Sequence, residues 1–348
     1  MDKYNSKKQI NQEVLQLIHK HLTEKGIQRF EYCGNWIDFF TDKELTKYKV
    51  NNADFCNHRF CPICMWRSAR KDSLKISVLL DYLEQEFNRA FIFLTLTAPN
   101  VTAAQLSAEI TKYNKKFKEL MRRDVVEKMN DGFIRKLEIT YNGDLCITDE
   151  YYYKCQSYCD YMGLKIGDLN PNYDTYHTHF HCIFSVPKYY FKSKLYIKQE
   201  KWLELWRDVM QDPSITQVDV RRVKRGDSGK TAGDTDAKGT TKVRDKAQFE
   251  IAKYAAKDTD FVYSQEVFDV FYNALRGRQV LTYGGSFAAA NKKYKAKELE
   301  HYKTVDDTDY VYLVYYKWLN EYVEQKRKML TPEMYQALKK TALDDAPI

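Results

Sequence analysis

The stretch Tyr176-His177-Thr178-His179-Phe180-His181-Cys182-Ile183-Phe184 decides how this chain is organised. It holds three of the seven histidines of the sequence, and these three are spaced two residues apart. Side chains alternate between the two faces of a β-strand, so the spacing predicts a strand with His177, His179 and His181 on one face. Imidazoles that converge in this way suit a divalent metal ion. The alternative is a set of strand histidines that bond only to backbone or solvent.

A second predicted strand, from Gly132 to Tyr141, offers a partner for the histidines. Its alternation places Lys136, Glu138 and Thr140 on one face and apolar residues on the other. If this polar face adjoins the histidine face, Glu138 is the carboxylate best placed to add an oxygen ligand. A solvated strand glutamate is the alternative.

The N-terminal part of the chain is rich in cysteine. Cys61 and Cys64 form a C-x-x-C knuckle that can grip one ion, and Cys33 and Cys56 can complete a tetrahedral zinc site. His58 is the spare ligand if one of these cysteines does not bind. A redox-active pair fits less well, because no thioredoxin-like βαβ pattern surrounds the knuckle. Cysteines that merely fill a core are the remaining alternative.

Composition sets the broad class of the protein. The 348 residues contain 44% hydrophobic and 30% charged residues, which fits a soluble protein with a real core. The formal net charge of +8 is moderate for this length and does not by itself indicate nucleic acid. The sequence shows no long apolar run and no signal-peptide core at its start, so we expect a cytoplasmic protein without a membrane segment. Thiols stay reduced there, which favours metal ligands over disulfides.

A third group of reactive side chains lies in a predicted helix that contains Glu250, Tyr254 and Lys257. Their spacing places a carboxylate, a phenol and an ammonium group on one helix face. Phosphoryl transfer to a tyrosine needs these three groups as proton carrier, nucleophile and counter-charge. A surface helix with glutamate and lysine on one face has the same pattern, so the motif gains weight only beside a metal site.

The remaining segments follow hydrophobic periodicity and turn signals. The predicted helices cover residues 8–24, 73–87, 102–123 (opened by a Thr102/Gln105 capping box) and 193–210, with another starting near Thr331, and further strands cover 91–97 and 218–223. Residues 224–245 are rich in Gly, Thr, Lys and Asp, and we expect a flexible basic loop there.

Taken together, these blocks resemble the replication initiators of rolling-circle plasmids in Gram-positive bacteria, within the HUH endonuclease superfamily. The resemblance rests on the order and content of five blocks. They are Cys33-Gly34 with Cys56 and Arg59-Phe60-Cys61-Pro62-Ile63-Cys64-Met65-Trp66-Arg67; Phe93-Leu94-Thr95-Leu96-Thr97; Arg135-Lys136-Leu137-Glu138-Ile139-Thr140-Tyr141-Asn142; His177-Thr178-His179-Phe180-His181; and Ala252-Lys253-Tyr254-Ala255-Ala256-Lys257-Asp258.

This resemblance implies an α+β fold. We expect a central antiparallel β-sheet of the RRM/ferredoxin-like type, with helices on one face and the metal-binding histidines on the other. The expected division is an N-terminal helix with the zinc-binding segment (1–75), a nicking and joining domain (76–290) and a helical C-terminal extension (291–348). Within the middle domain, residues 142–175 form an insertion.

The resemblance also implies site residues. The family's His-hydrophobe-His element maps onto His179, Phe180 and His181, and Glu138 is the third ligand for Mn²⁺ or Mg²⁺. His177 matches a variable position of the family, and the long segment before it puts the third ligand in question.

The family's nucleophile maps onto Tyr254, which would form a 5′-phosphotyrosine link to single-stranded or hairpin origin DNA. Glu250 would support the terminating cleavage, and Lys257 would neutralise charge. The expected protein is therefore a bacterial, cytoplasmic single-strand DNA endonuclease and strand transferase with a structural Zn²⁺.

Other functions stay open at the level of sequence. A relaxase or a single-strand transposase shares the histidine motif, although relaxases commonly carry the tyrosine before the histidines. A zinc-containing protein that binds origin DNA without cleaving it, or a metalloenzyme that does not act on nucleic acid, is a further alternative. The sequence also leaves open whether the tyrosine-rich tail contacts a host helicase, a second protomer in a homodimer, or DNA.

Overall fold

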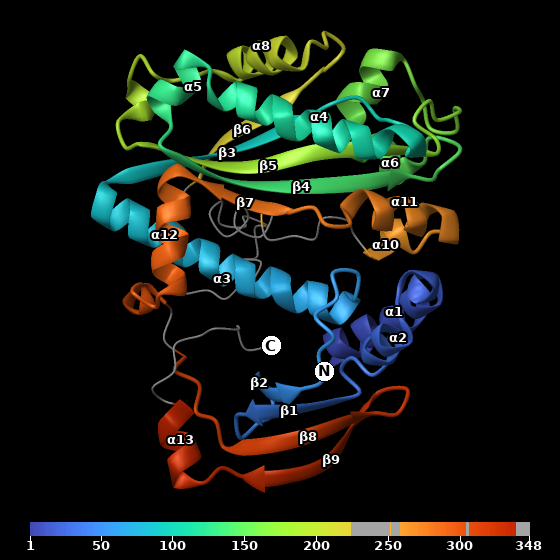
Figure 1. The fold of residues 1–348 in the computed structure, drawn as a ribbon, viewed down its shortest axis with the longest axis vertical. Helices are drawn as coiled ribbons and strands as arrows, with labels where there is room; N and C mark the ends of the chain where they lie inside the picture. Colours follow the sequence, from blue (N-terminus) through green and yellow to red (C-terminus); the bar gives the residue numbers. More distant parts are fainter. Residues whose placement is uncertain (224–250, 252–257, 304–305, 339–348) are drawn as a thin grey trace. The chain divides into compact units, whose positions relative to one another are not determined.

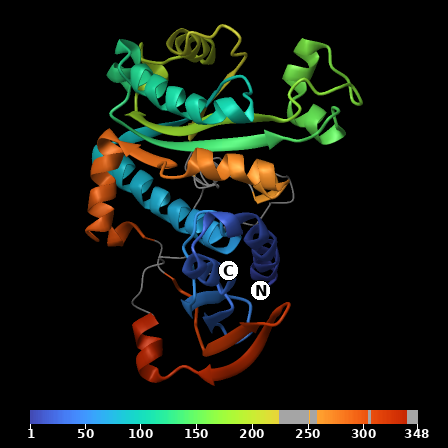
Figure 2. The same ribbon diagram turned by 45° about the vertical axis from the view of Figure 1, so that its right-hand side comes forward.

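The computed structural model describes residues 1–223, 251, 258–303 and 306–338. It contains two antiparallel sheets that belong to two compact units of the chain (Figure 1). One unit is built from residues 1–82 together with the part of the chain from Lys292 onward, and the other is built mainly from residues 83–291. The two sheets and their helices are also visible in Figure 2. The expected α+β class with antiparallel sheets is confirmed.

The second unit is organised around a five-stranded sheet with the strand order β6-β3-β5-β4-β7. Its strands are β3 (Arg89–Thr97), β4 (Gly132–Asn142), β5 (Thr175–Pro187), β6 (Val218–Val223) and β7 (Leu281–Gly284). Its helices are α4 (Ala103–Met121), α5 (Asp124–Met129), α6 (Asp149–Lys154), α7 (Gln156–Met162), α8 (Gln199–Met210), α10 (Asp258–Phe261), α11 (Gln265–Leu275) and most of α12 (Gly285–Lys295). The histidine stretch forms β5, which lies between β3 and β4 in the centre of the sheet.

One face of this sheet is covered by α4 and α8, which lie together on the same side in Figure 1. Phe180 of β5 is fully buried there, with its ring centroid 5.1 Å from that of Tyr113 and 5.7 Å from that of Phe117. Trp202 of α8 packs on Phe184 at 5.8 Å. Because Phe180 and Phe184 alternate with the histidines, this packing fixes which face of β5 the imidazoles occupy.

One helix departs from the expectation that all helices lie behind the sheet. Phe287 of α12 packs on Phe91 of β3, with ring centroids 5.8 Å apart. Phe91 lies on the same face of β3 as Thr95, which is paired with His181. The histidine face is therefore covered at one end by α12.

The first unit contains a four-stranded sheet with the order β2-β1-β8-β9. Its elements are α1 (Asp2–Ile18), η1 (His19–His21), α2 (Glu24–Glu31), β1 (Trp36–Thr41), β2 (Tyr48–Ala53), α3 (Pro62–Phe87, of which residues to Tyr82 belong here), η3 (Glu300–Tyr302), β8 (Tyr312–Trp318), β9 (Tyr322–Met329) and α13 (Pro332–Leu338). Tyr4 of α1 stands at the centre of its aromatic core, with edge contacts to Phe39 of β1 and Trp66 of α3.

The C-terminal part of the chain differs from the expected helical extension over 291–348. Residues 312–329 form the strands β8 and β9, and β8 pairs with β1 so that Val314 lies opposite Phe39. Aromatic and β-branched residues of β8 favour a strand. The partner strand β1 lies near the other end of the sequence, so no local pattern revealed the pairing. The N-terminal segment and the C-terminal segment thus share one sheet.

Some expectations fall on residues that the structure does not describe. The flexible basic loop at 224–245 and the helix with Glu250, Tyr254 and Lys257 lie outside the described residues. Within the described part of the chain, no helix combines the length and the apolar character that crossing a membrane requires.

Candidate metal centres

Strand register brings the first candidate centre together. In the pairing of β4 with β5, Glu138 lies opposite His179 and Lys136 lies opposite His181. Directly paired residues of antiparallel strands share a face, so the polar face of β4 adjoins the histidine face as the sequence predicts. Glu138, His179 and His181 offer ligand atoms that all lie within 4.8 Å of one another.

The distances in this group fit a divalent ion. The Glu138 Oε2 atom lies 2.9 Å from His181 Nε2 and 3.4 Å from His179 Nε2. Neighbouring ligands of an octahedral ion with bonds of about 2.1 Å are about 3 Å apart. A carboxylate oxygen and two imidazole nitrogens are also a donor set that such ions accept. We therefore find a group able to hold a metal ion, as expected.

Partial burial shapes the electrostatics of this group. The side chains of Glu138, His179 and His181 are only 8%, 12% and 13% exposed to solvent. Burial acts to raise the pKa of the Glu138 carboxyl, but hydrogen bonds from His179 and His181 outweigh it and hold that pKa below its usual range. Burial lowers the pKa of His179. An ionised carboxylate beside a neutral imidazole is the state in which both bind metal.

Neighbouring side chains orient His181. The Thr95 hydroxyl lies 3.2 Å from His181 Nδ1, which leaves Nε2 directed at Glu138. The ring also stacks on Phe93, with centroids 5.5 Å apart. A hydrogen bond to the second ring nitrogen is the usual way in which proteins fix a metal-binding imidazole. The sequence analysis assigned no role to Thr95, which entered it only as part of a predicted strand and of the block Phe93-Leu94-Thr95-Leu96-Thr97.

His177 lies on the same face but outside the group of three ligand atoms. Its ring centroid is 5.3 Å from that of His179. Burial lowers the pKa of His177 to about 3, with the neighbouring His179 acting in the same direction. The structure therefore keeps His177 beside the candidate centre without placing it among the converging atoms.

The second candidate centre is formed by the four predicted cysteines, Cys33, Cys56, Cys61 and Cys64. Cys33 follows α2, and Cys56 lies in the loop after β2. Cys61 directly precedes α3, whose first residue is Pro62, a favoured residue at that position. Cys64 lies in the first turn of α3, where the helix dipole favours thiolates. Loop residues and the N-terminus of α3 thus bring together cysteines that lie apart in the sequence.

The sulfur atoms have the spacing of a tetrahedral site. The Sγ atom of Cys33 lies 3.5 Å from those of Cys61 and Cys64, and the Cys56–Cys64 separation is 3.7 Å. Four sulfurs at about 2.3 Å from one zinc ion are about 3.8 Å apart. His58, the spare ligand of the sequence analysis, is not in the group, and its Nδ1 accepts a hydrogen bond from the Phe60 amide.

Backbone and α1 side chains surround these sulfurs. The amides of Cys56 and Asn57 donate to Cys33 Sγ and Cys64 Sγ. Asn11 of α1 donates to Cys61 Sγ at 3.4 Å. Lys8 is only 2% exposed, and its ammonium group donates to the carbonyl oxygens of Glu31 and Cys33 at 2.8 Å each. Burial lowers the pKa of Lys8, while the nearby cysteines act against that shift.

Lys8 and Asn11 are functional candidates that the sequence analysis missed. The signal was present, because Tyr4, Lys8 and Asn11 occupy the buried stripe of α1 at helical spacing. A lysine on such a stripe needs a buried partner of negative charge or a set of acceptors. The cysteine centre supplies both.

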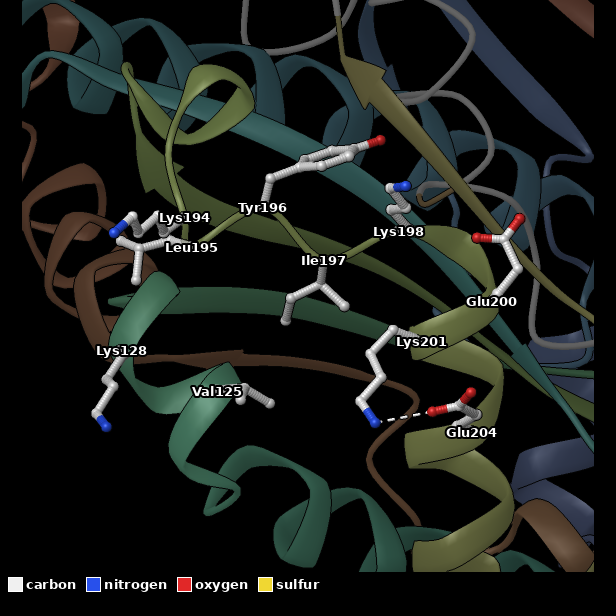
Figure 3. A pocket seen from close by; sticks show the side chains of 10 residues that line it. All are labelled: Val125, Lys128, Lys194, Leu195, Tyr196, Ile197, Lys198, Glu200, Lys201 and Glu204. Atoms are coloured by element: carbon white, nitrogen blue, oxygen red, sulfur yellow. Dashed lines mark hydrogen bonds and ion pairs between the residues drawn. The ribbon is translucent and has the colours of Figure 1, made fainter.

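A groove of about 510 Å³ also opens in the second unit, between α5 and the start of α8 (Figure 3). Its lining includes Lys128, Lys194, Lys198 and Lys201, and the last of these pairs with Glu204 at 2.8 Å. None of its lining residues belongs to either candidate centre. The groove therefore takes no part in the candidate metal chemistry.

Comparisons with known proteins place this arrangement in context. The family model described as "Replication protein" matches residues 47–329. A "Protein rep" of Staphylococcus aureus is 38% identical over 263 residues, covering 75% of this chain and 95% of that protein. A "Protein rep" of Bacillus amyloliquefaciens is 31% identical over 286 residues, covering 79% of this chain and 75% of that protein. One from Streptococcus pneumoniae is 29% identical over 293 residues, covering 82% and 78%. No solved structure matches the chain.

Proposed function

This chain belongs to the replication protein family whose model matches residues 47–329, and from that membership we propose that it nicks and rejoins the origin DNA of a rolling-circle plasmid. The observation that carries the proposal is the convergence of Glu138, His179 and His181 on one sheet face. Mn²⁺ or Mg²⁺ held by these three side chains would polarise the phosphate that is cleaved. The cysteine group holds a structural Zn²⁺ in this proposal.

Tyr254 is the proposed nucleophile. Its phenol oxygen forms a bond to phosphorus while the bond between phosphorus and the 3′ oxygen breaks. The products are a 5′-phosphotyrosine and a 3′ oxygen, which takes up the proton released by the phenol. The resulting 3′-hydroxyl primes synthesis. Lys257 offsets charge on the phosphate, and Glu250 activates water or the new 3′ end when the round closes. These roles rest on the resemblance to the family and on the spacing of the three residues in the sequence, because they lie outside the described part of the structure.

The decisive experiment uses supercoiled DNA that carries the plasmid's own origin. The full-length protein is incubated with this DNA with and without Mn²⁺, and covalent adducts are sought by denaturing gel and peptide mass. We expect an adduct that needs the metal, carries the DNA on its 5′ end and maps to the Tyr254 peptide. Tyr254→Phe should bind the origin like wild type and form no adduct.

The opposite outcomes are equally informative. Nicking by Tyr254→Phe at a near wild-type rate would remove Tyr254 from the role of nucleophile. Tight origin binding without an adduct under any metal would favour the non-catalytic, zinc-containing DNA-binding protein. Metal-dependent cleavage of single strands without the plasmid origin would instead favour a transposase-like or relaxase-like activity.

A further inference from the structure

One face of the four-stranded sheet in the first unit gathers aromatic rings and lysines. Across β1 and β8, Trp36 is paired with Lys317 and Asp38 is paired with Tyr315. Tyr315 is in turn paired with Lys326 of β9. Directly paired residues share a face, so these side chains form two rows on one side of the sheet.

The opposite side of the same sheet is the core. Ile37, Phe39 and Val314 are fully buried there, and they alternate with the residues of the two rows. The rows themselves reach solvent at several points. Trp36 is 37% exposed, and Lys317, Lys326 and Lys328 are exposed. We call the set Trp36, Tyr315, Lys317, Lys326 and Lys328 the aromatic–lysine face.

Helix α13 packs on only one end of this side of the sheet. Phe40 and Leu313 form a cluster with Met334 and Leu338 of α13, so α13 covers the row of paired residues that ends in Lys328. Tyr315 of the neighbouring row is partly buried against the same cluster. The Lys328 ammonium lies 5.6 Å from the centre of the Tyr315 ring. A cation beside a ring face is a geometry in which a base can stack while its phosphate meets the charge.

Asp38 lies between these residues but is closed to solvent. It is only 6% exposed, and its Oδ1 atom has no hydrogen-bond partner among the described residues. Burial raises the pKa of this carboxyl. Because the Oδ1 atom has almost no accessible surface, a ligand on the sheet face cannot reach it, and Asp38 is not counted among the contacts.

We propose that the aromatic–lysine face binds single-stranded DNA, with Trp36 and the exposed part of Tyr315 stacking on bases and the three lysines contacting phosphates. Unpaired bases are required because a duplex hides the base faces on which aromatic rings stack. This inference rests on the proposed function, which generates single-stranded origin DNA. It adds a second DNA contact in a unit that does not contain the histidine centre.

The test measures binding of the full-length, zinc-loaded protein to a fluorescent single-stranded oligonucleotide from the nicked origin strand, by anisotropy at several salt concentrations. Trp36→Ala should weaken binding about tenfold, as expected for the loss of one stacking ring. Changing Lys317, Lys326 and Lys328 together to Ala should reduce the slope of log K against log salt by about 2, since each lost phosphate contact on a single strand contributes about 0.7.

A matched control changes three exposed lysines of the groove in Figure 3, Lys128, Lys194 and Lys198, to Ala. It removes the same charge from the other unit, so its salt slope should stay at the wild-type value. If both triple variants lowered the salt slope equally, the assignment would be overturned. Equal losses would mean that the DNA is attracted by the overall positive charge of the protein and not by this face. Wild-type binding by both Trp36→Ala and the sheet triple variant would overturn it as well.

Two further results separate this inference from the proposed function. Duplex DNA bound as tightly as the single strand, and lost in the same variants, would overturn the single-strand assignment. Adduct formation on Tyr254 is scored separately, with saturating oligonucleotide and Mn²⁺. Sheet variants that bind weakly yet form the adduct at saturation would support the inference. A wild-type protein that binds through this face but forms no adduct would refute only the nicking reaction.

Discussion

At the scale of single residues, the histidine face contains a candidate ligand set and also His177, a neighbouring histidine outside that set that serves as a control. We expect Glu138→Ala to weaken Mn²⁺ binding by more than about 100-fold, because even the loss of an outer partner of a metal ligand costs about 10- to 100-fold. His177→Ala should change the affinity much less, since His177 lies outside the converging atoms. Titration calorimetry on the zinc-loaded protein compares the two. Equal losses would mean that His177 is a ligand too.

Lys8 allows a similar comparison at the cysteine centre. A zinc ion bound by the four thiolates would carry net negative charge, and the buried ammonium group of Lys8 donates to the carbonyl oxygen of Cys33, one of the four cysteines. We expect Lys8→Met to weaken zinc binding about 10- to 100-fold, the usual cost of losing an outer partner. Competition with a chromophoric chelator measures this, with exposed Lys3→Met on the same helix as the control. Unchanged zinc affinity in Lys8→Met would limit Lys8 to a packing role.

The placement of the candidate ligands was well predicted where a short sequence pattern determines it. The alternation of His179 and His181, the C-x-x-C knuckle and the polar face of Glu138 each follow from spacing alone. Thr95, Lys8 and Asn11 were missed because each acts on a group that lies far away in the sequence. For these residues, tertiary packing decides the partner.

At the scale of elements, the strand β5 is held by its apolar side. Phe180 lies between the two candidate ligands in sequence and is fully buried against Tyr113 and Phe117 of α4. We expect Phe180→Ala to lower the free energy of unfolding by about 3–5 kcal/mol, the usual cost of such a cavity. Mn²⁺ affinity should fall as well, because both neighbours of Phe180 are candidate ligands of the ion.

Denaturant unfolding and Mn²⁺ titration of the same variant check this prediction. Tyr189→Ala, at a residue that is 64% exposed, serves as the control and should leave both quantities near their wild-type values. A Phe180→Ala protein with lowered stability and wild-type Mn²⁺ affinity would mean that the ligand positions do not depend on this packing.

Elements with a strong local pattern were predicted closely. The capping box of Thr102 and Gln105 opens α4, with the Thr102 amide donating to Gln105 Oε1 at 3.0 Å, and β6 has the predicted bounds 218–223. Helix α1 instead runs from Asp2 to Ile18 rather than over 8–24. Its buried stripe starts at Tyr4 and includes Lys8 and Asn11, polar residues that an apolar pattern does not count.

At the scale of the whole molecule, the first unit is closed by the C-terminal segment. Strand β1 lies between β2 and β8, so its pairing depends on residues near both ends of the chain. The backbone amide of Tyr322, at the start of β9, donates a hydrogen bond to Asn5 Oδ1 of α1 at 2.8 Å. This bond links the strand to the N-terminal helix. The Tyr322 hydroxyl donates to the carbonyl oxygen of Gly34, directly after the candidate ligand Cys33. The cysteine centre is thus supported by a strand more than half the sequence away.

This dependence predicts how truncation acts. Removing residues 306–348 takes away β8 and β9 and leaves β1 and β2 as a two-stranded hairpin, which is marginal in water. We expect the truncated protein to lose most of its zinc, as measured by atomic emission per chain, while it still binds Mn²⁺ through the second unit. Removing only residues 332–348 deletes α13 and keeps the sheet, so zinc should be retained. If a protein shortened to residue 305 keeps its zinc, the cysteine centre folds without the C-terminal strands. That result would fit the sequence-based expectation of a C-terminal extension separate from the N-terminal segment.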